Sequence, residues 1–193
     1  MGGKAEFERR LDYIFTANTS EQDLGANGAS ITTLMNIGNE PDFATPYEYN
    51  YINKQWKSVR QTRQLANEFF HDANYGVPGN SDAGALNSWL LWQMIGLYPV
   101  ATTAQYLIGS PWFSELNMTI GENKTLTIRS NNLNNENSYY VQSVKVNGQA
   151  WHQNWLDHTD VMVNGGTIEF EVGTQPMAWE TGSVPPSPGH YVM

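Results

Sequence analysis

The sequence predicts an α+β protein in which a helical first half is followed by an antiparallel β region. Apolar residues recur at helical spacing up to about residue 102, and short segments rich in β-branched residues follow. The dipeptide Asn147-Gly148 between two such segments is typical of a tight β-hairpin. We therefore expect a helical part over residues 1–102, an antiparallel β region over 103–180 and a Pro-rich tail over 181–193.

The helical half contains three segments with the pattern of helices. Residues 5–15 and 47–70 show the periodicity of amphipathic helices. The most apolar segment, 83–100, follows three good N-cap residues and reaches Pro99, where we expect its helix to end. Polar residues interrupt this segment, and a bilayer span needs about 20 apolar residues. We therefore expect a buried core helix and no membrane partner.

The β half shows the alternation of strands that bury one face. Ile168, Phe170 and Val172 alternate with Thr and Glu residues, so we predict that their side chains face the core from one strand. Helices followed by strands in one chain indicate two layers or two subdomains.

Composition excludes several classes of function. The 193 residues carry 10 basic and 19 acidic side chains, a net charge of −9, which argues against a nucleic acid as partner. Cysteine is absent, which excludes a disulfide, a thiolate nucleophile and a cysteine zinc site. No apolar stretch follows Met1, so this chain shows no signal peptide. The sequons at Asn18, Asn117 and Asn123 matter only for a secreted protein.

The first candidate site is the loop Gly38-Asn39-Glu40-Pro41-Asp42. It offers one carboxamide and two carboxylates on a Pro-stiffened segment, and hard oxygen ligands of this kind suit calcium. The alternative is a turn that the Asn and Asp side chains stabilise. The local sequence leaves both interpretations open.

The second candidate site is Gly79-Asn80-Ser81-Asp82, just before the apolar helix. The Asp82 carboxylate there is a candidate general base that deprotonates a water molecule. The positive end of the helix favours the ionised carboxylate, which keeps it ready to accept a proton. The alternative is that Asp82 caps the helix and does nothing more.

Aromatic and histidine residues elsewhere are expected to be structural. Trp89 and Trp92 lie three residues apart on the apolar helix, which is typical of a core stripe. His158 and Asp160, with His152 nearby, fit no zinc spacing, so we expect structural roles for them.

Several ordered segments together resemble glycoside hydrolase family 92, the calcium-dependent exo-α-mannosidases. Each segment alone is a weak match, but their order and spacing over most of residues 5–178 make the resemblance specific. The segments are Ile37-Gly38-Asn39-Glu40-Pro41-Asp42, Thr45-Pro46-Tyr47-Glu48-Tyr49-Asn50, Gly76-Val77-Pro78-Gly79-Asn80-Ser81-Asp82-Ala83-Gly84, Met94-Ile95-Gly96-Leu97-Tyr98-Pro99, Tyr106-Leu107-Ile108-Gly109-Ser110-Pro111, Val146-Asn147-Gly148 and the block with His158, Asp160, Gly165-Gly166 and Phe170.

The resemblance implies a fold and a set of site residues. Members pair a β-sandwich domain with an (α/α)6 barrel and remove terminal α-mannose with inversion, assisted by one Ca²⁺ ion. Residues 1–102 then supply helical hairpins from the end of that barrel. By this resemblance Asp82 is the general base, Asn80 supports it, Asn39 is a calcium ligand and Glu40 lies close to the substrate.

Two departures from the family pattern matter. The general acid of the family is a Glu upstream of the Gly-Asn-x-Pro loop, and no counterpart is found in this chain. Ser81 also stands where many members carry an acid. We therefore expect a C-terminal fragment that lacks the N-terminal domain, is inactive alone, and derives from a secreted enzyme acting on mannose-containing glycans, with α-1,2 linkages favoured.

Two alternatives stay open. In the first, the chain is a non-catalytic carbohydrate-binding or structural remnant of the same fold. In the second, it is part of a glycosidase from another helical-barrel family. Separate measurements of mannose binding and hydrolysis distinguish the first alternative, and calcium dependence distinguishes the second.

Overall fold

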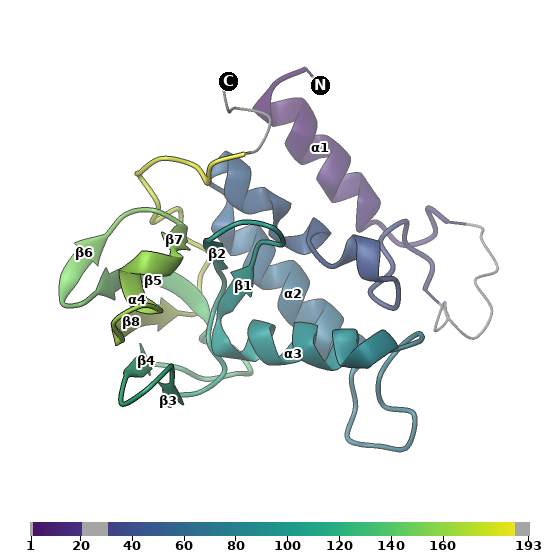
Figure 1. Cartoon of the computed structure of the whole chain (residues 1–193). Coiled ribbons are helices and arrows are strands. Elements are labelled where there is room, and N and C mark those ends of the chain that lie inside the picture. The colour runs from purple at the N-terminus through teal and green to yellow at the C-terminus, as the bar shows by residue number, and fades with distance from the viewer. Residues whose placement is uncertain (1, 21–30, 188–193) are drawn as a thin grey trace.

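Helices and strands occupy separate parts of the molecule in the computed structural model, which describes residues 2–20 and 31–187. The longer helices lie on one side and most strands on the other, with β1 and β2 between them (Figure 1). The α-helices of the first half are α1 (Lys4–Ile14), α2 (Gln55–Phe69) and α3 (Ala85–Ile95), and its 3-10 helices are η2 (Glu40–Asp42), η3 (Thr45–Ile52) and η4 (Asp82–Gly84).

The strands form two sheets. The three-stranded sheet has the order β1-β2-β7 and the five-stranded sheet the order β3-β4-β8-β5-β6. The strands are β1 (Leu97–Pro99), β2 (Gln105–Ile108), β3 (Glu115–Thr119), β4 (Thr125–Asn131), β5 (Tyr140–Val146), β6 (Gln149–Trp151), β7 (Trp155–Asp157) and β8 (Gly166–Gly173), and the short helix α4 (His158–Val161) follows β7.

The predicted α+β class with an antiparallel β region is confirmed, with one addition. All neighbouring strands pair antiparallel except β4 and β8, which are parallel. Asn147 and Gly148 both have positive φ, 50° and 78°, and join β5 to β6 in the predicted hairpin. Ile168 and Phe170 of β8 are fully buried, as their alternation predicts.

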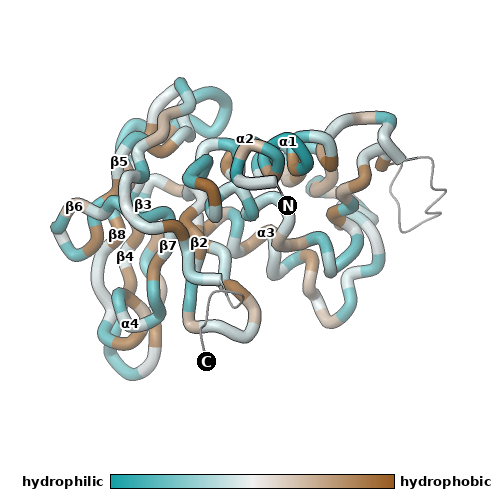
Figure 2. Tube along the Cα trace, turned by 90° about the horizontal axis from the view of Figure 1, so that it is seen from above, coloured by the Kyte–Doolittle hydropathy of each residue, from teal (hydrophilic) through white to brown (hydrophobic). Residues whose placement is uncertain are grey.

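Strand β2 joins the two parts because its side chains alternate between two cores. Leu107 packs in the cluster with helical residues such as Tyr47 and Trp89, whereas Ile108 packs in the cluster of the five-stranded sheet. Hydrophobic stretches are visible in β2 and the neighbouring strands in Figure 2. The helices that carry the candidate loops are therefore fixed against the sheets.

Two predicted helix boundaries were wrong. The helical pattern over 47–70 is broken at Asn53, whose φ of 56° places it in the left-handed region between η3 and α2. Helix α3 ends before Pro99, because Gly96 adopts φ of 86° and stops it. At Gly96 a Cβ atom would lie 2.6 Å from the Pro111 nitrogen, so no larger residue fits.

Buried hydrogen bonds fix α2 and η3 to the strands. Asn50 Nδ2 donates to the carbonyls of Ile108 and Asn154, and Gln55 Nε2 donates to the carbonyl of Gly109. Residues 181–187 follow without regular secondary structure, and the rest of the predicted tail lies outside the described residues. Within residues 2–20 and 31–187, no helix has the length and apolar character that crossing a membrane requires.

Candidate active site

The two candidate loops, far apart in the sequence, touch each other at a pair of glycines. Gly79 has φ of 64°, and a Cβ atom there would clash with the Gly38 carbonyl oxygen and lie 2.6 Å from the Gly38 Cα. Only glycine allows the backbones to approach so closely. The contact brings Asn39 and Glu40, which follow Gly38, next to the segment that leads to Asp82.

The first loop is closed by Asp42. Asp42 Oδ2 accepts a hydrogen bond from the Asn36 N–H at 3.0 Å, and the N–H of Asn39 donates to the Asn36 carbonyl at 3.0 Å. Burial raises the pKa of Asp42, and hydrogen bonds from the Asn36 backbone and the Asn39 side chain partly offset the rise. One of the two carboxylates noted in the sequence thus holds the loop in shape.

Glu40 and Asn39 have free oxygens in this loop. Glu40 Oε1 is buried and has no hydrogen-bond partner among the described residues. A buried carboxylate oxygen without a hydrogen-bond partner lowers the stability of the fold unless a cation or a hydroxyl donor approaches it. Asn39 is exposed, and because its side chain donates to Asp42 through nitrogen, the carboxamide oxygen remains an acceptor.

The second loop presents Asp82 to solvent with Asn80 beside it. Asn80 Nδ2 donates to Asp82 Oδ1 at 3.1 Å, and the Asp82 N–H donates to the Asn80 carbonyl at 2.6 Å. Ser81 turns away, because its hydroxyl donates to Asn87 Oδ1 at 3.0 Å on α3. Asp82 and Asn80 therefore form a hydrogen-bonded pair, and their roles as base and supporting residue remain predictions.

The capping interpretation of Asp82 is wrong. Helix α3 begins after Gly84, and neither η4 nor α3 has a side-chain cap hydrogen bond. Ala83 and Gly84 both adopt left-handed conformations, with φ of 52° and 74°. A left-handed alanine costs about 1–2 kcal/mol, and such strain persists where the surroundings impose it, often at functional sites.

Trp89 of α3 holds the first loop in place. Its Nε1 donates to the Phe43 carbonyl at 3.1 Å, just after η2. Its ring also stacks on Phe70, at the start of the segment that leads to the second loop, with ring centroids 5.7 Å apart. Trp89 is buried, as predicted, but no sequence pattern indicates this hydrogen bond.

The first loop supplies only part of the ligand set that a hard cation needs. A carboxylate oxygen without a partner and a free carboxamide oxygen are ligands that Ca²⁺ accepts, although Ca²⁺ takes about 6–8 oxygens. Across the described ranges 2–20 and 31–187, no group of three or more His, Cys, Asp or Glu side chains is placed to hold a metal. Further ligands would have to be carbonyls, water or groups outside this chain.

The histidine and acid residues of the β region have structural partners. His158 Nδ1 lies 2.9 Å from Tyr106 Oη. Asp160 Oδ2 accepts from the Asp157 N–H at 2.7 Å, completing a capping box at the start of α4. These contacts agree with the structural roles predicted for them.

The chain is similar to known proteins in sequence and in fold. The family model described as the glycosyl hydrolase family 92 catalytic domain matches residues 1–174. A protein of Arthroderma benhamiae, named an uncharacterized secreted glycosidase, is 32% identical over 193 residues, covering 98% of this chain and 23% of that protein.

Two solved structures share the fold. A family GH92 α-mannosidase of Bacteroides thetaiotaomicron in complex with mannoimidazole superposes with a TM-score of 0.87 at 29% identity, over 96% of this chain and 25% of that chain. A family GH92 inverting mannosidase of Bacteroides thetaiotaomicron has a TM-score of 0.79 at 24% identity, and the match covers 97% of this chain and 27% of that chain. At this identity the similarity shows the fold alone.

The chain thus spans about a quarter of the length of the relatives it matches. The family model covers nearly all of the described residues, including both loops that meet at Gly38 and Gly79. The chain belongs to glycosyl hydrolase family 92, of whose catalytic domain it contains a part.

Proposed function

We propose that this chain is the base-bearing part of a larger, secreted, calcium-dependent exo-α-mannosidase that hydrolyses mannose-containing glycans with inversion, with α-1,2 linkages favoured. The observation that carries the proposal is the contact of Gly79 with Gly38. At this contact the loop that carries Asn39 and Glu40 adjoins the segment that leads to Asn80 and Asp82, which supports a shared site. The name of the relative at 29% identity, an α-mannosidase in complex with mannoimidazole, supports the substrate class.

In this proposal Asp82 takes a proton from the water that attacks the sugar. Its carboxylate is exposed and held by one hydrogen bond from Asn80, which leaves acceptor capacity for a water molecule. Asn80 orients the carboxylate and remains neutral, so it does not compete for the proton. An inverting glycosidase places its acid and base about 6.5–9.5 Å apart, which leaves room for that water.

Asn39 and Glu40 would hold a calcium ion and the sugar hydroxyls next to it. A bound Ca²⁺ would bind two hydroxyls of the terminal sugar and favour the ring shape of the transition state. Glu40 contributes the negative charge, and its buried Oε1 gains the partner that it lacks among the described residues. Asn39 contributes a neutral oxygen while Asp42 fixes its orientation.

The general acid and the remaining sugar contacts would come from the rest of the parent protein. About three quarters of the length of the relatives lies outside the matched region. We infer that α1, α2 and α3 are helical hairpins of an (α/α)6 barrel that other helices complete.

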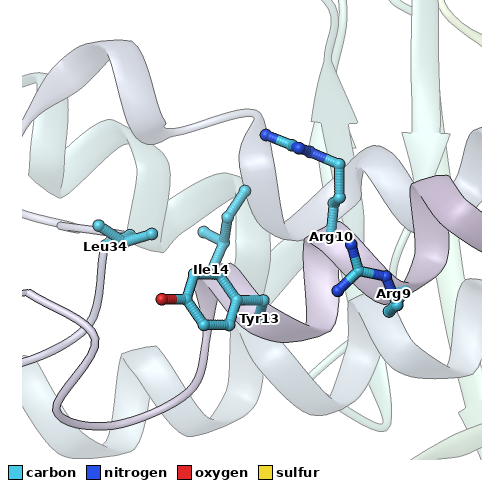
Figure 3. A pocket seen from close by; sticks show the side chains of 5 residues that line it. All are labelled: Arg9, Arg10, Tyr13, Ile14 and Leu34. Atoms are coloured by element: carbon cyan, nitrogen blue, oxygen red, sulfur yellow. The ribbon is translucent and has the colours of Figure 1, made fainter. Parts of the chain in front are cut away.

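The outer face of α1 supports this inference. A surface hollow of about 250 Å³ lies there between Arg9, Arg10, Tyr13, Ile14 and Leu34 (Figure 3). Tyr13 and Leu34 are 53% and 46% exposed, which is high for large apolar side chains beside a hollow. We propose that further helices of the parent cover this face, and that the isolated chain associates through it.

The test compares Asp82→Asn with Asp72→Asn in the parent enzyme. We expect Asp82→Asn to lower kcat by about 10²–10⁴-fold, the usual contribution of a general base, with little change in unfolding temperature because Asp82 caps no helix. Asp72 is an exposed Asp of the segment between α2 and α3 and serves as the matched control.

The substrates are α-1,2-mannobiose and an aryl α-mannoside, each with Ca²⁺ and with a chelator. Unchanged hydrolysis by Asp82→Asn would contradict the assignment of the base. Full activity in the presence of chelator would contradict calcium dependence and favour a glycosidase of another helical-barrel family. Mannose binding without hydrolysis by the parent would favour the carbohydrate-binding alternative.

A further inference from the structure

We propose that Tyr75, in the turn that precedes the loop of Asp82, is a substrate-binding residue on which a sugar beyond the terminal mannose stacks. The proposal rests on the function proposed above and deepens it, because it assigns a contact for the part of the glycan that is released as product. The exposure of the ring, the conformation of its backbone and the place of its turn carry the proposal.

Tyr75 presents its whole side chain to solvent. It is 103% exposed, whereas the other large exposed apolar side chains in the ranges 2–20 and 31–187 are 39–57% exposed. An aromatic ring in water lacks the favourable free energy that burial would give it. Such a ring is available for an apolar surface from outside the chain, and the C–H face of a sugar ring is a surface of this kind.

The backbone of Tyr75 adopts a conformation that bulky residues rarely adopt. Its φ of 62° lies in the left-handed region, and in the described part of the chain it is the only aromatic residue with a positive φ. Gly and Asn adopt this conformation more readily and would suit a turn with a purely structural purpose. Strained residues cluster at ligand-binding sites, so the strain indicates that the aromatic side chain itself has a function.

The turn that carries Tyr75 is fixed at its base. The His71 N–H donates to the Gly76 carbonyl at 2.8 Å, and the Gly76 N–H donates to the Ala73 carbonyl at 2.9 Å. Gly76 is buried, and a Cβ atom there would clash with the His71 carbonyl oxygen. A preformed turn and a side chain with two torsions lose little conformational entropy when a ligand binds.

This turn lies beside the candidate active site. The segment between α2 and α3 extends away from the helices next to the start of α3 (Figure 1). Tyr75 precedes Gly79 by four residues, so their Cα atoms are at most about 14 Å apart, and Gly79 contacts Gly38 of the first loop. An exo-enzyme holds only the terminal sugar at the reacting atoms, so the other sugars extend across the rim of the site, where Tyr75 lies.

The experiment compares KM values of the parent enzyme for substrates of different length. Tyr75→Asn removes the ring and keeps a residue that tolerates the left-handed conformation. We expect the KM for α-1,2-mannotriose to rise about threefold to tenfold, the size of one aromatic contact, with little change in kcat. Hydrolysis of α-mannosyl fluoride, which has no sugar beyond the scissile bond, should be unchanged. Tyr75→Phe keeps a ring and should retain the wild-type KM.

The unfolding temperature separates sugar stacking from a structural role. Because Asn relieves the left-handed strain, Tyr75→Asn should unfold at a temperature equal to or above that of the wild type. Thr102→Asn is the matched control, because Thr102 is exposed with φ of 65° between β1 and β2, and its KM should not change. A lower unfolding temperature for Tyr75→Asn would show that Tyr75 packs against another part of the parent and would overturn the proposal.

A binding measurement distinguishes failure of this proposal from failure of the mannosidase function. The probe is a thio-linked α-1,2-mannotriose, which resists hydrolysis, titrated into the parent protein by calorimetry. If the wild type binds this probe but hydrolyses no mannoside, the mannosidase function fails, whereas a Kd about threefold to tenfold weaker for Tyr75→Asn still supports stacking. Equal Kd values for wild type and Tyr75→Asn, or no binding by the wild type, would overturn the proposal.

Discussion

The indole nitrogen of Trp89 donates a hydrogen bond to the carbonyl of Phe43 at 3.1 Å and so ties the loop of Glu40 to helix α3. The same helix begins directly after the loop of Asp82. One buried side chain therefore sets the distance between the residue proposed to bind metal and substrate and the proposed base. We therefore predict that Trp89 positions the loop of Glu40 relative to Asp82, although it takes no direct part in the reaction.

Trp89→Phe keeps an aromatic ring on Phe70 and removes the hydrogen bond to Phe43. We expect a loss of stability of at least about 1 kcal/mol, because the Phe43 carbonyl loses its donor. We also expect a lower kcat in the parent enzyme with a smaller change in KM. Trp92→Phe on the same helix is the control, since no described residue accepts a hydrogen bond from Trp92. Equal effects on kcat would show that Trp89 contributes packing alone.

The contact between Gly79 and Gly38 predicts a second, larger effect. Gly79→Ala introduces a Cβ into the Gly38 backbone in addition to the strain of a left-handed alanine. Gly121→Ala isolates the strain, because Gly121 has φ of 61° and nothing within 4 Å of the added Cβ.

We expect about 1–2 kcal/mol of destabilisation from Gly121→Ala and about 1–3 kcal/mol more from Gly79→Ala, measured by denaturant unfolding. Gly79→Ala should also lower activity in the parent, because the loops must separate. If the two variants were equally stable, the close approach of the loops would not exist in solution.

Sequence reasoning identified both loops and most of the secondary structure from short-range signals. The hairpin at Asn147-Gly148 and the alternation in β8 follow from turn chemistry and from a two-residue period, and both are present. The (α/α)6 barrel and the division into parts at residue 102 remain predictions.

What the sequence did not predict depends on contacts between distant residues. Nothing local shows that Gly79 lies on Gly38, or that Asp42 closes the first loop while Glu40 keeps a free oxygen. The predicted continuous helix is interrupted at Asn53, because this residue adopts a left-handed conformation. The parallel pairing of β4 with β8 likewise depends on the order of strands in the sheet and not on their composition.

Glu40 provides a test of the metal site that does not require activity. We expect Ca²⁺ to raise the unfolding temperature of the chain, since a ligand that binds only the native state stabilises it by about 2.7 kcal/mol at 100 times its Kd. Glu40→Gln keeps the shape of the side chain and removes its charge. Ligand charge tunes calcium affinity over orders of magnitude, so we expect affinity to fall by about tenfold or more by calorimetric titration.

The Glu40 variant should be at least as stable as the wild type in chelator, because a buried carboxylate oxygen without a partner is removed. Glu122→Gln changes an exposed carboxylate in the β3–β4 turn and is the control. Wild-type calcium affinity in Glu40→Gln would exclude Glu40 as a ligand.

Glu180 fixes the segment after β8 to helix α2. Its Oε1 accepts from the Gln55 N–H at 2.8 Å, while Oε2 is buried without a hydrogen-bond partner in the described part of the chain. Burial raises the pKa of Glu180 from its ordinary value of 4.5, and hydrogen bonds from Gln55 and neighbouring groups offset only part of the rise.

A carboxyl group whose pKa is higher in the folded than in the unfolded state binds protons more tightly when folded. Its contribution to stability is therefore fully present below the unfolded pKa, near 4.5, and is lost as the pH rises through the higher folded pKa. Glu180→Gln keeps the acceptor for Gln55 and cannot ionise. Unfolding temperatures of the two proteins should therefore diverge in favour of Glu180→Gln as the pH rises from 4 to about 7. Glu136→Gln, at an exposed position, should show no such divergence. Parallel pH profiles of the unfolding temperature for wild type and Glu180→Gln would mean that burial does not destabilise the Glu180 carboxylate.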